Sequence, residues 1–332
     1  MALHLTLACG DYDRTRALAD GTVAPEGVTL NYVTLRPGEL FQRVARHREF
    51  PAAEMSLATY LNLRARGDDG LVAIPVYPSR LFRHGYIFIN VAAGISGPAD
   101  LRGKRVGAEQ YQLTSALWQR GLLQDEYGVS PASMIWYLGG QDEPGHKERA
   151  TISFPPGLAV HHLAPQATLS QMLAAGEIDA IFAPHVPRCV REGAPTVARL
   201  FPDFPAVEAG YYRRTGLFPI MHLVVIRRDV YEAHRWIAVS LFKAFCEAKR
   251  VALERLRFTG TLAAMVPWLV AALEEAEALF GEPYWPYGLE ANRKELETAI
   301  RYAHEQGVAI RRLDVDELFA PETLAAECRA WQ

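Results

Sequence analysis

Residues 74–90 read IPVYPSRLFRHGYIFIN, and this stretch indicates how the chain is organised. An apolar run ends at Pro78, a polar segment follows, and a second apolar run begins at Tyr86. Short apolar runs bounded by turn signals are typical of buried strands. The polar segment between the two strands contains Ser79, Arg80, Arg83 and His84. Because Arg binds carboxylates bidentately and His titrates near neutral pH, the segment predicts a site for an acidic small molecule. A solvated loop with two surface arginines is the alternative.

The overall composition fits a globular protein of about two domains. The chain has 332 residues, of which 50% are hydrophobic and 22% charged, and a single core rarely grows to that size. The formal net charge is −3, and no tract of Lys or Arg occurs, which argues against binding to nucleic acid or to a membrane surface. No apolar run reaches the roughly 18 residues of a transmembrane helix.

The cysteines and the N-terminus predict a reducing compartment. Four cysteines lie far apart in the sequence, with no CxxC motif, at Cys9, Cys189, Cys246 and Cys328. We therefore expect buried or incidental thiols and no disulfide framework or zinc site. Leu3, Leu5 and Leu7 alternate with polar residues, which is typical of a first β-strand and not of a secretory signal. A cytoplasmic protein is the expectation.

The order of predicted elements indicates an α/β fold. Strands at 3–7, 28–35 and 53–56 alternate with a helix opened by Pro37 and another over Leu57–Arg66, an alternation that favours a mostly parallel sheet. Further along, the pattern predicts a helix over Ser115–Tyr127, a long excursion over 141–165, a helix over Leu169–Ala175 and a strand over 218–227. From Tyr231 the chain is helical, with helices expected over Trp236–Leu256, Leu262–Phe280 and Ala291–His304.

Two kinds of motif carry a family resemblance. DLRGKRVG (100–107) and GEIDAIFAP (176–184) are similar to segments of the type II periplasmic-binding-protein fold. Narrower segments resemble the 4,5-dihydroxyphthalate decarboxylase family, and they extend over nearly the whole chain: YPSRLFRH (77–84), TSALWQRGLLQDEYGV (114–129), TGLFPIMHLVVIRRDVY (215–231), WPYGLEANR (285–293) and ELFAPET (317–323).

The resemblance implies a two-lobed α/β protein with a ligand cleft between the lobes. Each lobe would have a mixed sheet flanked by helices, followed by a helical C-terminal segment. Lobe 1 would comprise 1–88 plus 215–332, and lobe 2 would comprise 89–214. Ligands of open α/β sheets bind beyond the carboxyl ends of strands, so the polar loops there are expected to face the cleft. These loops lie at Asp11, Ser56, 79–84, 109–114, 184–185 and His222.

The family resemblance also implies a reaction, the cofactor-independent decarboxylation of 4,5-dihydroxyphthalate or a close relative. Protonation of the ring carbon that bears the carboxylate, para to a hydroxyl, gives a dienone from which carbon dioxide can leave. The protein must hold two carboxylates, polarise a phenol and supply a proton. Arg80 and Arg83 fit carboxylate binding, and His84 or His222 fits the acid–base role. The remaining substrate-binding candidates are Asp11, Glu109 and Tyr111 for the hydroxyls, and Ser56, Ser79 and Thr114 for orientation.

Each assignment has a structural alternative. Arg80 and Arg83 can be salt-bridge partners between lobes, and His84 can satisfy backbone groups. His222 lies within an apolar strand pattern, where a hydrogen-bonded core imidazole is common. Asp11 and Thr114 can simply cap helices; Thr114 lies at a helix start that can also bind an anion.

Other kinds of site receive no support from the sequence. His161 and His162, with His146 and His185, invite a metal, but adjacent histidines lack the usual ligand spacing, so no metal and no cofactor are expected. Three hypotheses remain: a cytoplasmic decarboxylase, a solute-binding protein that captures an aromatic or dicarboxylic anion without chemistry, and a sensing or biosynthetic relative of the same fold. A homo-oligomer is an expectation from the family resemblance alone.

Overall fold

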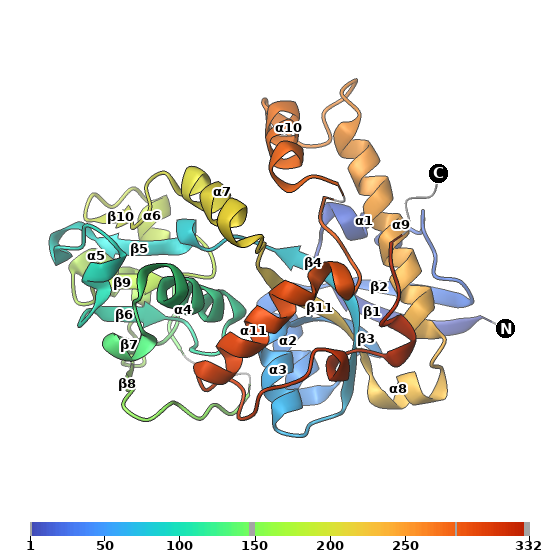
Figure 1. Cartoon of the computed structure of the whole chain (residues 1–332), viewed down its shortest axis with the longest axis horizontal. Helices are drawn as coiled ribbons and strands as arrows, with labels where there is room; N and C mark the ends of the chain where they lie inside the picture. Colours follow the sequence, from blue (N-terminus) through green and yellow to red (C-terminus); the bar gives the residue numbers. More distant parts are fainter. Residues whose placement is uncertain (1, 146–149, 283, 329–332) are drawn as a thin grey trace.

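The chain forms two lobes, each built on a mixed β-sheet (Figure 1). The computed structural model describes residues 2–145, 150–282 and 284–328. The first sheet has the order β2-β1-β3-β11-β4 and contains Leu3–Cys9 (β1), Val28–Thr34 (β2), Ala52–Ser56 (β3), Leu71–Arg80 (β4) and Ile220–Arg227 (β11). The second has the order β10-β5-β9-β6-β7-β8 and contains Ile87–Asn90 (β5), Arg105–Ala108 (β6), Ile135–Leu138 (β7), Ala159–His162 (β8), Ala180–Phe182 (β9) and Val197–Arg199 (β10).

The strand directions in the first sheet bring the ends of several strands together at one edge. β1 runs parallel to β2 and β3, whereas β11 runs antiparallel between β3 and β4. Ile220, the first residue of β11, is opposite Arg80, the last residue of β4. The carboxyl ends of β1, β3 and β4 therefore meet the beginning of β11, as the predicted cleft requires.

Eleven helices within the described residues surround the two sheets. Those of the first half are Asp13–Ala19 (α1), Pro37–His47 (α2), Leu57–Ala65 (α3) and Thr114–Tyr127 (α4); then come Leu169–Ala175 (α5), Arg188–Arg191 (α6) and Phe204–Thr215 (α7). The C-terminal part adds Arg228–Ala233 (α8), Ile237–Arg257 (α9), Leu269–Phe280 (α10) and Arg293–Glu305 (α11). α9 packs against α1 and β4, and α11 packs against α3 and α4.

The predicted elements agree with the structure in most places but not in all. β8 lies inside the long excursion expected over 141–165, and β4 continues through Pro78 to Arg80. Helices begin at Pro37, Leu57 and Leu169, as the capping and periodicity patterns indicate. The helix expected from Leu262 begins only at Leu269, because Pro267 has no backbone N–H to donate to a preceding turn. The expected lobe boundary at residue 88 also differs from the sheets, since all of β5 pairs within the second sheet.

The first half of α4 joins the two lobes. The indole N–H of Trp118 donates to the carbonyl oxygen of Ile220 at 3.0 Å, and the amide of Gln119 donates to the carbonyl oxygen of Tyr86. Gly121 is required here, because a Cβ atom would lie only 2.2 Å from the ring of Tyr302 on α11. The N-terminal half of α4 is thereby held against the edge of the first sheet where β4 ends and β11 begins.

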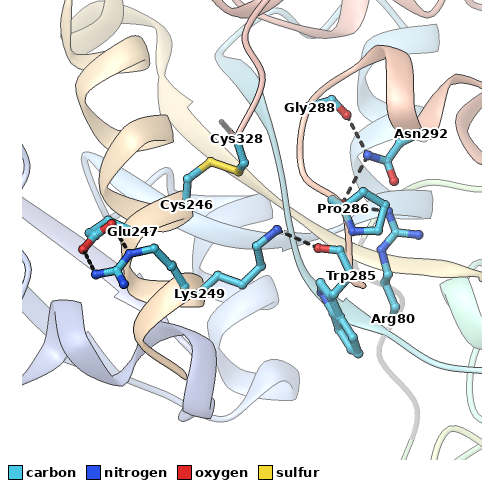
Figure 2. Close-up of a disulfide and its surroundings, with 10 residues drawn as sticks. Arg80, Cys246, Glu247, Lys249, Trp285, Pro286, Gly288, Asn292 and Cys328 are labelled. Carbon is cyan, nitrogen blue, oxygen red and sulfur yellow. Dashed lines mark hydrogen bonds and ion pairs between the residues drawn. A yellow bond between two sulfur atoms is a disulfide. The ribbon is translucent and has the colours of Figure 1, made fainter. Parts of the chain in front are cut away.

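One expectation about the cysteines is wrong. Cys246 on α9 and Cys328 near the C-terminus form a disulfide with Cα atoms 5.5 Å apart, although 82 residues separate them in the sequence (Figure 2). The C-terminal segment returns along the first lobe, where Phe319 bridges Ala73 and Glu327 bridges Gly288. That return brings the two sulfur atoms together, which spacing in the sequence does not reveal. Cys9 and Cys189 are buried free thiols, as expected.

Replacing Cys328 with Ser is expected to destabilise the oxidised protein. Loss of a crosslink that closes a long loop lowers the free energy of unfolding by about 2–5 kcal/mol. Urea denaturation of the variant and of the wild type, each with and without dithiothreitol, measures the effect. The reductant should lower the wild type to the level of the variant and leave the variant unchanged. Equal denaturation midpoints under oxidising conditions would contradict the contribution of this bond.

Candidate active site

A buried carboxylate and a histidine form the centre of the site. Glu54 lies in β3 and His222 in the first part of β11; in the strand register His222 is opposite Ser56, and Val224 is opposite Glu54. The two side chains therefore share one face of the sheet. His222 Nδ1 lies 2.6 Å from Oε1 of Glu54, and Glu54 is fully buried.

The loop after β1 supplies the other partners of Glu54. The hydroxyl of Tyr12 donates to Oε1 at 2.7 Å, and the backbone N–H of Gly10 donates to Oε2 at 2.8 Å. Burial acts to raise the pKa of Glu54, but the charge of His222 and these hydrogen bonds outweigh it and leave the pKa below its ordinary value. Burial and the negative charge of Glu54 raise the pKa of Tyr12, which keeps its hydroxyl protonated as a donor. Glu54 is thus an ionised hydrogen-bond acceptor on the Nδ1 side of His222.

His222 has one ring nitrogen left for chemistry. The ionised Glu54 accepts the hydrogen of Nδ1, and both hydrogen-bond contacts that His222 makes with described side chains, to Glu54 and to Tyr12, are at Nδ1, which leaves Nε2 open. The side chain is 16% exposed, and its ring contacts the edge of Phe41 with centroids 4.6 Å apart. A carboxylate that fixes the tautomer and stabilises the imidazolium is the arrangement of a general acid–base histidine.

Arg83 is a buried cation without a carboxylate partner. Its Nε and Nη2 lie 3.1 and 2.9 Å from the sulfur of Met221, and its Nη1 donates to the carbonyl oxygen of Pro184 at 3.0 Å. A thioether is only a weak acceptor, and burial lowers the pKa of Arg83 to about 10. Among the described residues Arg83 forms no salt bridge, although the charge of Glu208 acts on it from a longer distance. A ligand carboxylate would satisfy this guanidinium.

Arg80, three residues earlier, has its partners within lobe 1. Nη1 donates to the carbonyl oxygen of Phe218 at 3.0 Å and lies 3.5 Å from Glu295, while Nη2 donates to the carbonyl oxygen of Pro286. Figure 2 shows its guanidinium directed at the turn that contains Pro286. Arg80 therefore ties β4 to the C-terminal return; it pairs with a carboxylate, but within lobe 1 and not between the lobes as the salt-bridge alternative had it.

His84 occupies a closed environment next to Glu208. It is 1% exposed, neither ring nitrogen has a hydrogen-bond partner among the described residues, and its ring packs against Phe201 and Tyr211. Burial, and then the charge of Arg214, lowers the pKa of His84 to about 4, so the ring is neutral. This placement favours His222 over His84 as the acid–base residue.

Replacing Glu208 with Gln is expected to make the stability less dependent on pH. Glu208 accepts the backbone N–H of Gly85, and burial raises its pKa from 4.5 to about 7. A raised carboxyl pKa contributes stability that is complete below pH 4.5 and is lost as the pH rises through about 7. The variant should therefore be more stable than the wild type above pH 7, by up to about 3 kcal/mol, and similar to it at low pH.

Urea unfolding of both proteins at several pH values measures this difference. His84 is present in both, so its own titration cancels. Glu275→Gln, on the exposed side of α10, is the control and should follow the wild type. A difference between Glu208→Gln and the wild type that does not change with pH would contradict the prediction.

Ser56 and Thr114 meet directly, although they come from different lobes. Their hydroxyl oxygens lie 3.0 Å apart, and the Thr114 oxygen also accepts the backbone N–H of Ala58 at 3.0 Å. Ser56 caps α3, and Thr114 is the first residue of α4. The two loops are thus in direct contact, and their role in binding a ligand stays a prediction.

The remaining predicted residues are less closely grouped. Ser79 is half-buried and opposite His222 in the strand register. Glu109 is half-buried just after β6. Tyr111 is fully buried beneath Arg120, whose guanidinium carbon lies 3.7 Å from the ring centroid. Asp11 has a side chain that is 72% exposed and faces Arg16, so it lies outside the Glu54 cluster.

Glu54, Tyr12 and Gly10 are site residues that the sequence interpretation missed. Glu54 is the single charged residue of AAEMS, a strand in which every residue is buried. A carboxylate within such a strand needs hydrogen-bond partners, and that requirement is the signal that could have drawn attention to it. Tyr12 is next to the predicted Asp11, but the loop carries no periodicity that would show which side chain turns inward.

The structure contains no group that resembles a metal site within the described residues. His185 lies beside Gln141, with its Nδ1 2.8 Å from the amide nitrogen, and the ring of His161 stacks on Tyr137. His146 lies outside the described residues. No helix in the described chain is long and apolar enough to span a bilayer.

Comparison with curated proteins places the chain in a family. It is 38% identical over 322 residues to the 4,5-dihydroxyphthalate decarboxylase of Comamonas testosteroni, covering 97% of this chain and 98% of that protein. The chain belongs to the 4,5-dihydroxyphthalate decarboxylase family. A protein of the same name from Pseudomonas putida is 38% identical over 211 residues, which are 64% of this chain and 82% of that protein. A scan against family models found no match.

Solved structures confirm the predicted periplasmic-binding-protein fold of this decarboxylase-family chain. The periplasmic aliphatic sulphonate binding protein SsuA from Escherichia coli superposes with a TM-score of 0.56 at 15% identity, covering 98% of this chain and 99% of that protein. The alkanesulfonate-binding protein SsuA from Xanthomonas axonopodis pv. citri, bound to MOPS, gives 0.52 at 14% identity, with 96% of each chain covered. At these identities the likeness concerns the fold alone.

Proposed function

We propose that this protein catalyses the cofactor-independent decarboxylation of 4,5-dihydroxyphthalate, or of a close relative, to protocatechuate or its counterpart. Membership of a family of carboxy-lyases supports the reaction type. The observation that carries the proposal is the pairing of His222 with the ionised, buried Glu54. Binding of an anion does not require a carboxylate behind an imidazole, whereas proton transfer to carbon does benefit from one.

The proposed roles follow from charge balance. An ionised Glu54 repels a dianionic ligand unless the neighbouring His222 carries a proton, so substrate binding favours the imidazolium. His222 then donates its Nε2 proton to the ring carbon that bears the leaving carboxylate. As the bond from that carbon to the carboxylate breaks, its electron pair returns to the ring and carbon dioxide leaves. Reprotonation of His222 from solvent completes the cycle, which consumes one proton for each carbon dioxide released.

Arg83 is the proposed ligand for a carboxylate. It forms no salt bridge with a described residue, and a fork of guanidinium N–H groups binds a carboxylate far better than a thioether does. Ser56, Ser79 and Thr114 are proposed to orient the ring hydroxyls, because they lie at the same edge of the first sheet as His222. Glu109 and Tyr111 are weaker candidates in this proposal, and Asp11 and Arg80 have no part in it.

Incubation of the purified protein with 4,5-dihydroxyphthalate tests the function directly. We expect stoichiometric release of carbon dioxide and protocatechuate, unchanged after exhaustive dialysis against EDTA. Calorimetric titration with the same compound separates the alternatives. Tight binding without turnover would contradict the enzyme and support a solute-binding or sensing protein, in keeping with the binding proteins that share the fold.

Location and self-association are also proposals. We propose a cytoplasmic protein that forms a homo-oligomer. The Cys246–Cys328 pair makes the location testable, because disulfides are rare in reducing compartments. Mass spectrometry after alkylation of intact cells should find both thiols free; an oxidised pair would contradict the cytoplasmic location.

A further inference from the structure

Large apolar side chains are exposed together between α9 and the first turn of α10. Met265 is 104% exposed, Trp268 76% and Phe258 62%, and Leu262 and Val266 are each about half exposed. The other strongly exposed large apolar residues of the described chain are scattered: Leu81, Val91, Trp236 and Ile310. Scattered apolar residues are normal on a protein surface, whereas a contiguous group marks an interaction site. We call residues 258–280 the arm.

α10, the helical half of the arm, has no buried residue in the structure as described. Figure 1 shows it standing off from both sheets, beside the upper end of α9. Its sequence, LVAALEEAEALF, is nevertheless rich in apolar residues. A 12-residue helix is marginal in water and is normally stabilised by burying an apolar face. α10 contacts α9 but is only partly covered by the rest of the described chain.

The arm is anchored at its C-terminal end. Phe280 packs against Phe218 and Tyr212 with ring centroids 4.8 and 4.7 Å apart. Arg257, at the end of α9, pairs with Glu277 at 2.7 Å. These contacts hold the last turns of α10, whereas the exposed apolar residues lie nearer the beginning of the arm.

A groove lies directly beside the arm on the same chain. This cavity, of about 630 Å³, is formed by α1, the last turns of α9 and the beginning of the arm. Its apolar lining is Val251, Ala252, Leu256, Phe258, Ala263 and Ala264. Asp13, Arg16, Glu254 and Arg255 also line it, so charges of both signs surround the apolar floor. An apolar projection next to an apolar groove is the requirement for a two-fold contact in which each copy fills the groove of the other.

We propose that the arm is a self-association surface, and that its occupant is the groove and arm of a second copy of this chain. Aromatic side chains bury roughly 150–250 Å² each when covered, so Phe258 and Trp268 alone offer roughly 200–350 Å² at their exposed fractions. A stable interface needs about 800 Å² from each partner. The remaining arm residues and the groove supply further area, and the mixed charges of the groove complement themselves across a two-fold axis.

A membrane surface is the less suitable partner. The arm contains Glu274, Glu275 and Glu277 and no Lys or Arg. Anionic lipids attract basic segments and repel acidic ones. A second copy satisfies the apolar residues without that cost.

Sedimentation velocity of the full chain at several concentrations tests the surface. We expect the wild type to associate at micromolar concentration. The double variant Met265→Glu/Trp268→Glu should weaken association by at least about 100-fold, because exposed apolar anchors dominate such contacts. Ile310→Glu changes another exposed apolar residue, 55% exposed, which follows α11 and is not part of the arm, and this variant should associate like the wild type. Ala264→Trp, which fills the groove, should weaken association without changing the exposed anchors.

Three results would overturn the proposal. They are a monomeric wild type at 50-fold above the expected micromolar range (roughly 50 µM), unchanged association of the double variant, and equal weakening by Ile310→Glu. Circular dichroism of each variant checks folding, which substitutions of exposed side chains should leave intact. Because the readout is mass and not turnover, the outcome is independent of the proposed reaction.

Discussion

Replacing His222 with Asn should lower kcat by about 10²–10⁴-fold while the protein still folds and binds its substrate. Asn cannot donate a proton to carbon, and removal of a general acid–base group costs rate in this range. Glu54→Gln should produce a loss of similar size, because the neutral amide no longer stabilises the imidazolium. Steady-state kinetics with 4,5-dihydroxyphthalate, together with calorimetric binding, separates kcat from affinity.

The double variant makes this prediction sharper. If Glu54 acts through His222, combining the two substitutions should cost little more than the worse single one. His4→Asn is the control, because His4 is an exposed imidazole near the opposite end of β1 from the site, and its kinetics should match the wild type. Wild-type kcat in Glu54→Gln would remove the pair from the mechanism.

Replacing Arg83 with Met should weaken substrate binding and, at the same time, leave the fold as stable or more stable. A lost charge-assisted contact to a carboxylate should raise KM by roughly 10–100-fold. The free energy of unfolding should stay the same or rise by on the order of 1 kcal/mol. The reason is that no salt bridge offsets the desolvation penalty of this buried guanidinium. Kinetics and urea denaturation of one preparation measure both effects.

Arg80→Met is the matched control and should have the opposite effect on stability. Arg80 pairs with the buried Glu295 and with two carbonyl oxygens. Its removal leaves an uncompensated charge and should cost about 3–5 kcal/mol of unfolding free energy. Equal destabilisation by both substitutions, with KM unchanged in Arg83→Met, would show that Arg83 is structural.

Patterns that follow from local physics were predictable from the sequence. Alternating strands and helices, Pro37 at a helix start and the polar segment after β4 all depend on neighbouring residues. Because the carboxyl ends of parallel strands gather at one edge of a sheet, polar residues far apart in sequence could be expected to meet there, and Ser56, Ser79 and His222 do so in the first sheet.

What the sequence could not indicate depends on long-range arrangement. Whether Asp11 or Tyr12 turns inward is decided by the presence of Glu54 behind the loop. The partner of Cys246 is set by the C-terminal return, and the partners of Arg80 by the turn at Pro286. His84 and His222 are both histidines near strand ends, yet packing makes one neutral and enclosed and leaves the other with a free nitrogen.

The position of β11 has a consequence for synthesis on the ribosome. The second sheet uses only residues 87–199, so it can be completed as soon as that continuous segment has emerged. The first sheet lacks the strand between β3 and β4 until Ile220–Arg227 is made, roughly 140 residues after β4. At 5–20 residues per second this leaves two strand edges unpaired for roughly 7–30 s. We therefore expect the middle segment, residues 87–199, to fold first, and the nascent N-terminal segment that contains β1–β4 to be the part that depends on chaperones.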